Sequence, residues 1–208
     1  MDGIVLELQR EALIHDTDVV TLLRKAFLIA RKLKLSDFEN WISKELNGYS
    51  HEDNHPSYRK FTGQLKAWNP INGWIPVIIS SKEVYNEICI QYLSNPISNL
   101  ASFLKENSKL HFPFNDNVNT MLSSMTNSPL LTKYALYVGN NIIDTIIESV
   151  KTKVLEWALL LEENNILGNG LTFTNEEKDA ATHNPHITNY TINFFDKALD
   201  IQFQQGTD

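Results

Sequence analysis

The chain has 208 residues, enough for one domain with a substantial hydrophobic core, and its 42% hydrophobic and 21% charged residues are typical of a folded globular protein and exclude wholesale disorder. It shows neither an apolar stretch of about 20 residues nor the pattern of a signal peptide, so we expect no membrane partner and a cytoplasmic location. The net charge of −7 argues mildly against indiscriminate nucleic-acid binding.

Three helices are predicted at the N-terminus. The first covers about residues 3–14. Over residues 19–33, apolar residues recur at three- and four-residue spacing, which is typical of an amphipathic helix with one buried face. In the third helix, Ser36 and Glu39 fit a capping box and Gly48 fits a C-terminal stop. These helices form a predicted three-helix N-terminal unit.

The pattern changes after the third helix, where prolines and glycines interrupt β-rich runs. Such punctuation indicates strands joined by turns rather than a helix. A hairpin is predicted, with strands over about 62–68 and 74–79 joined by the loop 69–73, in which proline and glycine supply the turn dihedrals.

The middle of the chain alternates helices and strands. After Gly139, one wide apolar stripe runs to residue 161 without proline or glycine, which predicts a long central packing helix. Capping boxes at Ser80 with Glu83 and at Thr174 with Glu177 predict two helix starts. Four further helices are predicted: one from 80 to about 93, a second that ends at about 104, a third near 116–125 and a fourth from 174 to about 181. Two strands are predicted, near 109–114 and over 130–138.

The last stretch has a period of two. Apolar and polar residues alternate over 187–194 and 199–203, which predicts two strands. Such strands leave an apolar face and unpaired edges unless they pack on the domain or on other subunits. We therefore expect a domain over 1–182, then a linker and β-strand tail over 183–208 that mediates homo-oligomerisation. The side chains expected at that interface are Tyr190, Ile192, Phe194, Leu199, Ile201 and Phe203.

These elements together predict an α+β fold. It consists of an N-terminal three-helix unit, a β-hairpin and a short mixed sheet packed on a long central helix, and a C-terminal β tail. The single cysteine, Cys89, lies between two isoleucines, which favours a buried structural thiol over a nucleophile.

One catalytic pattern is present, the sequence H-E-x-x-H at residues 51–55. Zinc proteases need both histidines on one face of a helix. Here Gly48 precedes the pattern, and Pro56 disfavours helical dihedrals at His55, so we interpret it as a coincidence in a loop. The sequence shows no Walker loop, G-x-G-x-x-G or nucleophile elbow. We therefore expect no metal and no cofactor, and catalytic residues are unknown.

Several segments carry a family likeness through their order and spacing. They are LLRKA at 22–26, ARKLKL at 30–35, WISKELNGY at 41–49, PSYR at 56–59, AWNPINGWIP at 67–76 and VKTKVLEWALLLEENNILG at 150–168. Together with the helix that begins at Thr174, they resemble the AbiTii domain of bacterial abortive-infection systems over about residues 1–182. The resemblance implies a role in phage resistance, in which the infected cell stops growing or dies before phage are released. It supplies no agreed catalytic residues.

Aromatic and basic residues concentrate in the same central run. One interpretation is structural, with the large aromatic side chains packing the helical unit onto the hairpin. The other is a recognition surface, where aromatic side chains beside cations stack on and hydrogen-bond a nucleotide or an RNA segment. The basic residues of the second helix are either a solvated face or part of a polyanion-binding patch. The candidate binding residues are Arg31, Lys32, Tyr58, Arg59, Lys60, Trp68, Asn69 and Trp74.

The sequence therefore predicts a non-enzymatic sensor or scaffold in antiphage defence. We expect it to self-assemble through its tail and to meet a phage component or a second defence protein. The alternative is a binding module for a nucleotide or a nucleic acid. A further alternative is an effector enzyme with an unrecognised site, such as a hydrolase that uses Asp, Glu and His side chains.

Overall fold

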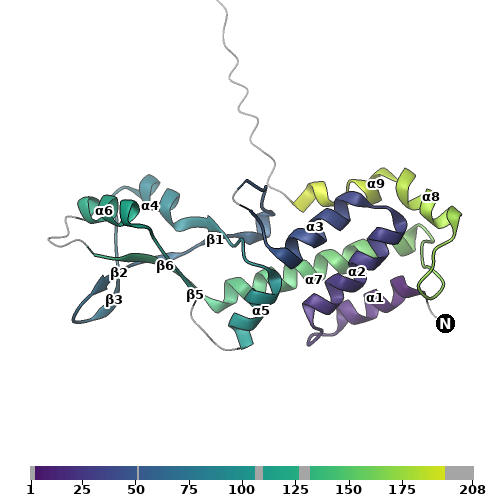
Figure 1. Cartoon of the computed structure of the whole chain (residues 1–208), viewed down its shortest axis with the longest axis horizontal. Coiled ribbons are helices and arrows are strands. Elements are labelled where there is room, and N and C mark those ends of the chain that lie inside the picture. The colour runs from purple at the N-terminus through teal and green to yellow at the C-terminus, as the bar shows by residue number, and fades with distance from the viewer. Residues whose placement is uncertain (1–2, 51, 106–109, 127–131, 195–208) are drawn as a thin grey trace, which may run out of the picture.

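The computed structural model describes residues 3–50, 52–105, 110–126 and 132–194. Figure 1 shows an elongated molecule in which most helices gather at one end and a sheet with two small helices lies at the other. The predicted α+β class is confirmed. The helices are α1 (Ile4–Leu13), α2 (Val19–Leu33), α3 (Ser36–Asn47), α4 (Lys82–Cys89), α5 (Ile97–Lys105), α6 (Asp116–Met125), α7 (Asn140–Glu163), α8 (Asn175–His183) and α9 (Pro185–Thr188), with 3₁₀ turns η1 (Ser57–Arg59) and η2 (Tyr190–Phe194). The strands are β1 (Lys60–Thr62), β2 (Gln64–Asn69), β3 (Gly73–Pro76), β4 (Ile90–Tyr92), β5 (Leu110–Pro113) and β6 (Tyr134–Val138).

The helical end is built around α7, which contacts α1, α2 and α5. Its apolar stripe is buried along its length, as the sequence predicts for a central packing helix. Trp157 of this stripe stacks on Phe38 of α3, with ring centroids 3.9 Å apart. The predicted three-helix N-terminal unit is confirmed as α1, α2 and α3. Burial of each such large apolar side chain contributes about 1.5–3 kcal/mol to folding.

The predicted helix caps are partly confirmed. The capping box of α8 forms with both hydrogen bonds, between Thr174 and Glu177. The capping box predicted for α3 is wrong, because Ser36 is already the first helical residue and Leu35 occupies the N-cap position. The side chain of Glu39 accepts a hydrogen bond from Arg31 of α2 instead.

The helix predicted to start at Ser80 begins one residue later. Its N-cap is Ser81, and it ends at Cys89 rather than continuing to residue 93. A short strand, β4, follows at once and pairs with β1 in a two-stranded ribbon that the sequence does not predict. Cys89 is fully buried, and burial raises the pKa of its thiol, so the predicted structural thiol is confirmed.

The larger sheet has the strand order β3-β2-β6-β5, and each neighbouring pair is antiparallel rather than mixed. The predicted hairpin is confirmed as β2 and β3. In its turn, the Asn69 side chain accepts the backbone N–H groups of Ile71 and Asn72. Gly73 has φ +69°, a left-handed conformation that favours glycine. Strands β5 and β6 confirm the two later strand predictions, whose first residues lie outside the described ranges.

The sheet has its own small core instead of lying flat on α7. Leu65, Tyr134 and Leu136 pack against Cys89 of α4 and Leu122 of α6. Figure 1 shows α4 and α6 together on one side of the sheet. The sheet reaches the α7 core at one end, where Leu110 and Val138 join the main cluster and Phe112 of β5 packs against it.

The strand predicted over 187–194 is wrong, because these residues form α9 and η2. Asn184 caps α9 and Pro185 occupies its first position, both of which favour a helix. The buried side chains Ile187, Thr191 and Phe194 also follow helical spacing of three and four residues. The segment thus fits both a strand pattern and a helix pattern, and its packing decides between them. The second predicted strand, 199–203, lies outside the described residues. No helix in the described part of the chain is long and apolar enough to cross a membrane.

Candidate functional site

The larger sheet has one covered face and one open face. Successive side chains of a strand point to opposite faces, and residues paired across strands share a face. Leu65 and Leu136 are paired on the face that α4 and α6 cover. The opposite face carries the other alternate residues, which no helix of the described residues covers (Figure 1). We call it the open face, and its polar and aromatic members are Gln64, Lys66, Trp68, Trp74, His111 and Tyr137.

Four aromatic rings form one connected cluster on the open face. Trp68 and Trp74 meet edge to face, with centroids 5.5 Å apart and planes at 68°. The Trp74 ring lies 5.7 Å from the Tyr137 ring. Tyr137 in turn stacks on His111 at 5.2 Å and 16°. Because these residues belong to β2, β3, β6 and β5, the cluster crosses all four strands.

The indole of Trp74 lies across the sheet rather than standing away from it. Trp74 is in the edge strand β3, yet its ring centroid is 6.3 Å from that of His111 in the opposite edge strand β5. Neighbouring strands are about 4.8 Å apart, so the ring must pass over β2 to make this contact. Ala135, which shares this face, is fully buried. The small side chain of Ala135 thus leaves room for a flat aromatic layer.

The open face is also locally cationic. The Lys66 ammonium lies 4.4 Å from the centroid of the Tyr137 ring, and within the described ranges it forms no ion pair with a carboxylate. Strands β2, β3, β5 and β6 contain Lys66 and His111 but neither Asp nor Glu. Exposed Lys133 adds a cation beside Trp68, since its carbonyl accepts the Trp68 N–H at 2.8 Å. The face is therefore basic although the chain carries −7.

The structure brings together only part of the predicted binding set. Trp68 and Trp74 are partners on the open face. Asn69 lies beside them, but its side chain is used in the hairpin turn. Arg31 and Lys32 belong to α2 at the helical end (Figure 1). There Arg31 pairs with a carboxylate of α3, and Lys32 donates to a main-chain carbonyl near α8.

Arg59 is not a surface residue, which corrects the prediction for it, and Tyr58 is half-buried with its hydroxyl used inside the fold. The Arg59 guanidinium is fully buried and donates to the two carboxylate oxygens of Glu45 at 2.6 and 3.1 Å. The hydroxyls of Tyr49 and Tyr58 each donate to Glu45 at 2.7 Å. Burial lowers the pKa of Arg59, but the Glu45 carboxylate outweighs it, and the pKa is raised overall. Lys60, the next residue, is exposed on β1 and lies outside the open face.

This buried network links α3 to η1 and to the segment that precedes α5. Arg59 also donates to the carbonyls of Leu93 and Asn95, at 2.6 and 2.9 Å, in the segment between β4 and α5. The Trp41 indole N–H donates to the Tyr58 hydroxyl at 2.8 Å, which links α3 to η1. The structural interpretation of the aromatic run thus holds for Trp41, Tyr49 and Tyr58. It does not hold for Trp68 and Trp74, which lie on the open face.

Sequence reasoning missed Lys66, His111 and Tyr137. The position of Lys66 can be predicted from the sequence, because strand alternation places residue 66 on the same face as Trp68. The positions of His111 and Tyr137 cannot be predicted from the sequence. They reach this face only because β6 pairs with β2 and β5 pairs with β6.

The H-E-x-x-H pattern has a loop conformation over its described residues, 52–55. Asp53 pairs with Lys44 at 2.7 Å, and the Nε2 atom of His55 lies 2.8 Å from the Ser94 hydroxyl. His51 lies outside the described residues. The predicted loop is thus confirmed for residues 52–55. No group of three or more His, Cys, Asp or Glu side chains is placed to hold a metal in the part of the chain that the structure describes.

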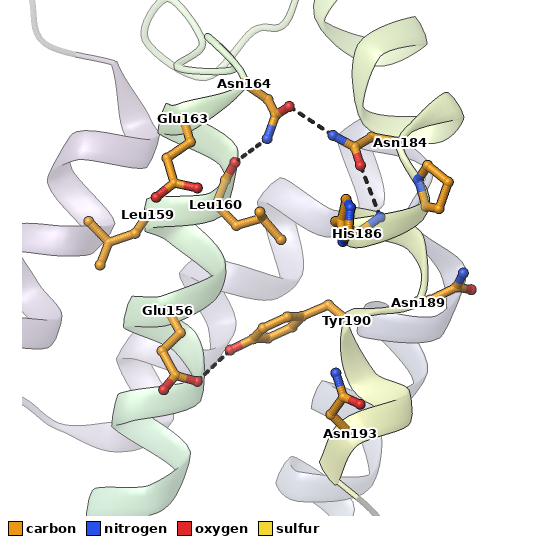
Figure 2. Close-up of a pocket in the computed structure, with 11 residues that line it drawn as sticks. Glu156, Leu159, Leu160, Glu163, Asn164, Asn184, His186, Asn189, Tyr190 and Asn193 are labelled. Carbon is orange, nitrogen blue, oxygen red and sulfur yellow. Dashed lines mark hydrogen bonds between the residues drawn. The ribbon is translucent and has the colours of Figure 1, made fainter.

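A groove of about 810 Å³ separates α7 from α9 and η2 (Figure 2). Figure 2 shows Tyr190 reaching across it to Glu156, to which its hydroxyl donates at 2.8 Å. Burial and the Glu156 carboxylate raise the pKa of Tyr190, so the hydroxyl stays protonated as a donor. The Asn184 amide donates to Asn164 at 2.7 Å. These bonds attach the C-terminal segment to α7, which gives the polar groups of the groove a structural role.

The comparisons with known proteins give one match. A family model described as AbiTii matches residues 3–186. The match begins just before α1 and ends within α9, so it includes the strands of the open face. No curated protein and no solved structure matches the chain.

Proposed function

Because the chain belongs to the AbiTii family, whose name points to abortive infection, we propose that it is a non-enzymatic sensor in phage defence that recognises its trigger on the open face. The ring cluster on that face is the observation that supports the proposal. Aromatic side chains usually anchor cores, yet 44% of Trp68 is exposed, and His111 at the other end of the ring cluster is exposed as well. Contiguous exposed aromatic surface marks sites of recognition.

The first prediction concerns defence against phage. Cells that carry the double substitution Trp68→Ala, Trp74→Ala are expected to lose protection, so that plaque counts return to those of cells without the gene. The two rings lie on the open face and outside both hydrophobic cores, so the free energy of unfolding should fall by less than about 2 kcal/mol.

The matched control for this test is Ile71→Ala. Ile71 is almost fully exposed in the turn of the same hairpin, so this variant should protect like the wild type. A double variant that folds and still protects fully would show that the open face does not sense the trigger.

We further propose that the protein self-assembles as a scaffold through its tail. The exposed side chain of Ile192, 63% accessible on η2, supports an apolar contact beyond the described fold. Tyr190 and Phe194 are used within the chain, where their rings pack at 5.0 Å, so they are removed from the expected interface. Leu199, Ile201 and Phe203 lie outside the described residues and stay in the proposal as predicted.

The second prediction concerns the mass of the particle in solution. Residues 1–208 are expected to elute as a defined oligomer in size-exclusion chromatography with light scattering, and residues 1–194 as a monomer. The full chain with Leu199→Ser, Ile201→Ser and Phe203→Ser should behave like the truncated one, because polar side chains remove the apolar contact. Equal masses for all three proteins would contradict tail-mediated assembly.

A further inference from the structure

We propose that the open face binds single-stranded nucleic acid, with bases stacked on its aromatic rings and phosphates held by Lys66 and Lys133. The inference rests on the proposed sensor function, because it names the ligand of the same site.

The shape of the open face suits unstacked bases. Four-stranded antiparallel sheets with aromatic side chains on an exposed face bind two or three bases of single-stranded RNA by stacking. Here the four strands that carry the rings span about 14 Å, and neighbouring ring centroids lie between 5.2 and 6.3 Å apart. Helices α4 and α6 support the sheet from behind, so the platform is rigid and the rings are held in place before a ligand arrives.

The exposure of the rings assigns them different tasks. Trp68 and His111 lie at the two ends of the cluster and are exposed, so each offers a surface to a base. Trp74 and Tyr137 lie between them and are half-buried, so they form the floor that connects the two stacking positions. Stacking of this kind tolerates any base, because each base has a π face.

The charge distribution favours a short stretch of polyanion. Lys66 is at the centre of the face and Lys133 at its edge, and the four strands carry no acidic side chain. The rest of the chain makes the net charge −7, which disfavours contact with a long phosphate backbone. Binding should therefore depend on stacking and only weakly on salt. With one or two phosphate contacts, log K should fall with log[salt] at a slope of about −0.7 to −1.4.

The same geometry discriminates against a duplex. In a double helix the bases are stacked on each other, and a flat sheet presents no element that enters a groove. The rings of the open face can reach a base only when the strand is unpaired. A duplex should therefore be bound at least about tenfold more weakly than a single strand of the same length.

The third prediction is tested on the full chain with labelled rU8, dT8 and the matching duplexes. Fluorescence anisotropy and quenching of tryptophan emission should show saturable binding of the single strands. Trp68→Ala and His111→Ala should each weaken binding by about 5- to 150-fold, the usual cost of losing one stacking ring, and Trp74→Ala should weaken it by removing the floor between the two stacking positions. Lys66→Gln should weaken it several-fold and reduce the salt slope by about 0.7. Ile71→Ala and Arg31→Gln, which change residues away from the face, should bind like the wild type.

Binding of either single strand supports the proposal, and the tighter of the two identifies RNA or DNA as the source. It is overturned if neither strand binds, if the duplex binds equally well, or if Trp68→Ala binds like the wild type. Trp68 is 44% exposed and lies outside both hydrophobic cores, so this variant keeps the test valid even if Trp74→Ala does not fold. If the tryptophan variants lose phage protection but the wild type binds no oligonucleotide, nucleic acid is not the ligand. The proposal that the open face is a sensor then remains supported. If binding depends on the rings but the variants still protect against phage, the open face is not the sensor. Nucleic-acid binding then remains supported.

Discussion

Replacing Arg59 with leucine is expected to lower the free energy of unfolding by about 3–5 kcal/mol. The guanidinium is the cation that neutralises the buried carboxylate of Glu45, at 2.6 Å, and neither side chain is exposed. Without it, Glu45 keeps the hydroxyls of Tyr49 and Tyr58 as donors but remains a buried charge with no counterion. Urea unfolding followed by circular dichroism should show a lower midpoint with an unchanged slope.

Two comparisons make this result specific to the ion pair. Arg59→Met combined with Glu45→Gln removes both charges and keeps an oxygen that accepts from the tyrosine hydroxyls, so it should recover much of the lost stability. Arg31→Leu breaks an ion pair with Glu39 whose arginine is exposed, and it should cost less than about 1 kcal/mol. A loss at Arg59 no larger than the loss at Arg31 would show that the buried pair does not hold the fold.

The position of Arg59 also changes how binding experiments are designed. A charge reversal at Arg59 would report on folding, because the side chain is fully buried and cannot contact a ligand. Its appearance among basic residues in the sequence suggested a surface, and its partner Glu45 lies 14 residues earlier, on α3. No local pattern links a helix position to a buried arginine of a later turn, so the pairing appears only in the folded structure.

The elements that the sequence predicts well are those with strong local patterns. The stripe of α7 repeats over about five turns of a helix, and the hairpin of β2 and β3 has a proline and a glycine in its turn. The residues that complete the open face do not belong to a strong local pattern. His111 and Tyr137 arrive from strands about 40 and 70 residues away, and their place depends on sheet register, which sequence periodicity does not fix.

The C-terminal segment shows how packing decides between two patterns. Residues 187–194 alternate in polarity, which favours a strand, but Ile187, Thr191 and Phe194 also repeat at four- and three-residue spacing. In the structure, Trp41 of α3 and the Phe194 ring pack edge to face at 5.1 Å. The apolar surface of α3 and α7 thus stabilises the helical alternative, and that surface is made by residues far away in the sequence.

Cutting the chain after Thr182 is expected to remove roughly 4–8 kcal/mol of stability, a large part of the 5–15 kcal/mol typical of a domain. The cut deletes Ile187 and Phe194, each 1% exposed, and the half-buried ring of Tyr190. Each buried apolar side chain contributes about 1.5–3 kcal/mol, and the cut would also expose apolar surface of α3 and α7. Residues 1–182 should therefore melt far below the full chain, or aggregate.

Residues 1–194 provide the matched comparison, because they keep α9 and η2 and remove only the residues beyond the described fold. Their melting temperature should equal that of the full chain at a protein concentration where both are monomers. Tyr190→Phe in the full chain removes the hydrogen bonds to Glu156 and to the Lys153 carbonyl but keeps the ring, so it should cost only about 1 kcal/mol. If residues 1–182 melt within a few degrees of the full chain, the predicted domain boundary after residue 182 is supported, and α9 and η2 contribute little to the stability of the domain. If they do not, the domain extends to Phe194, and assembly through the tail must be tested by truncation at that residue.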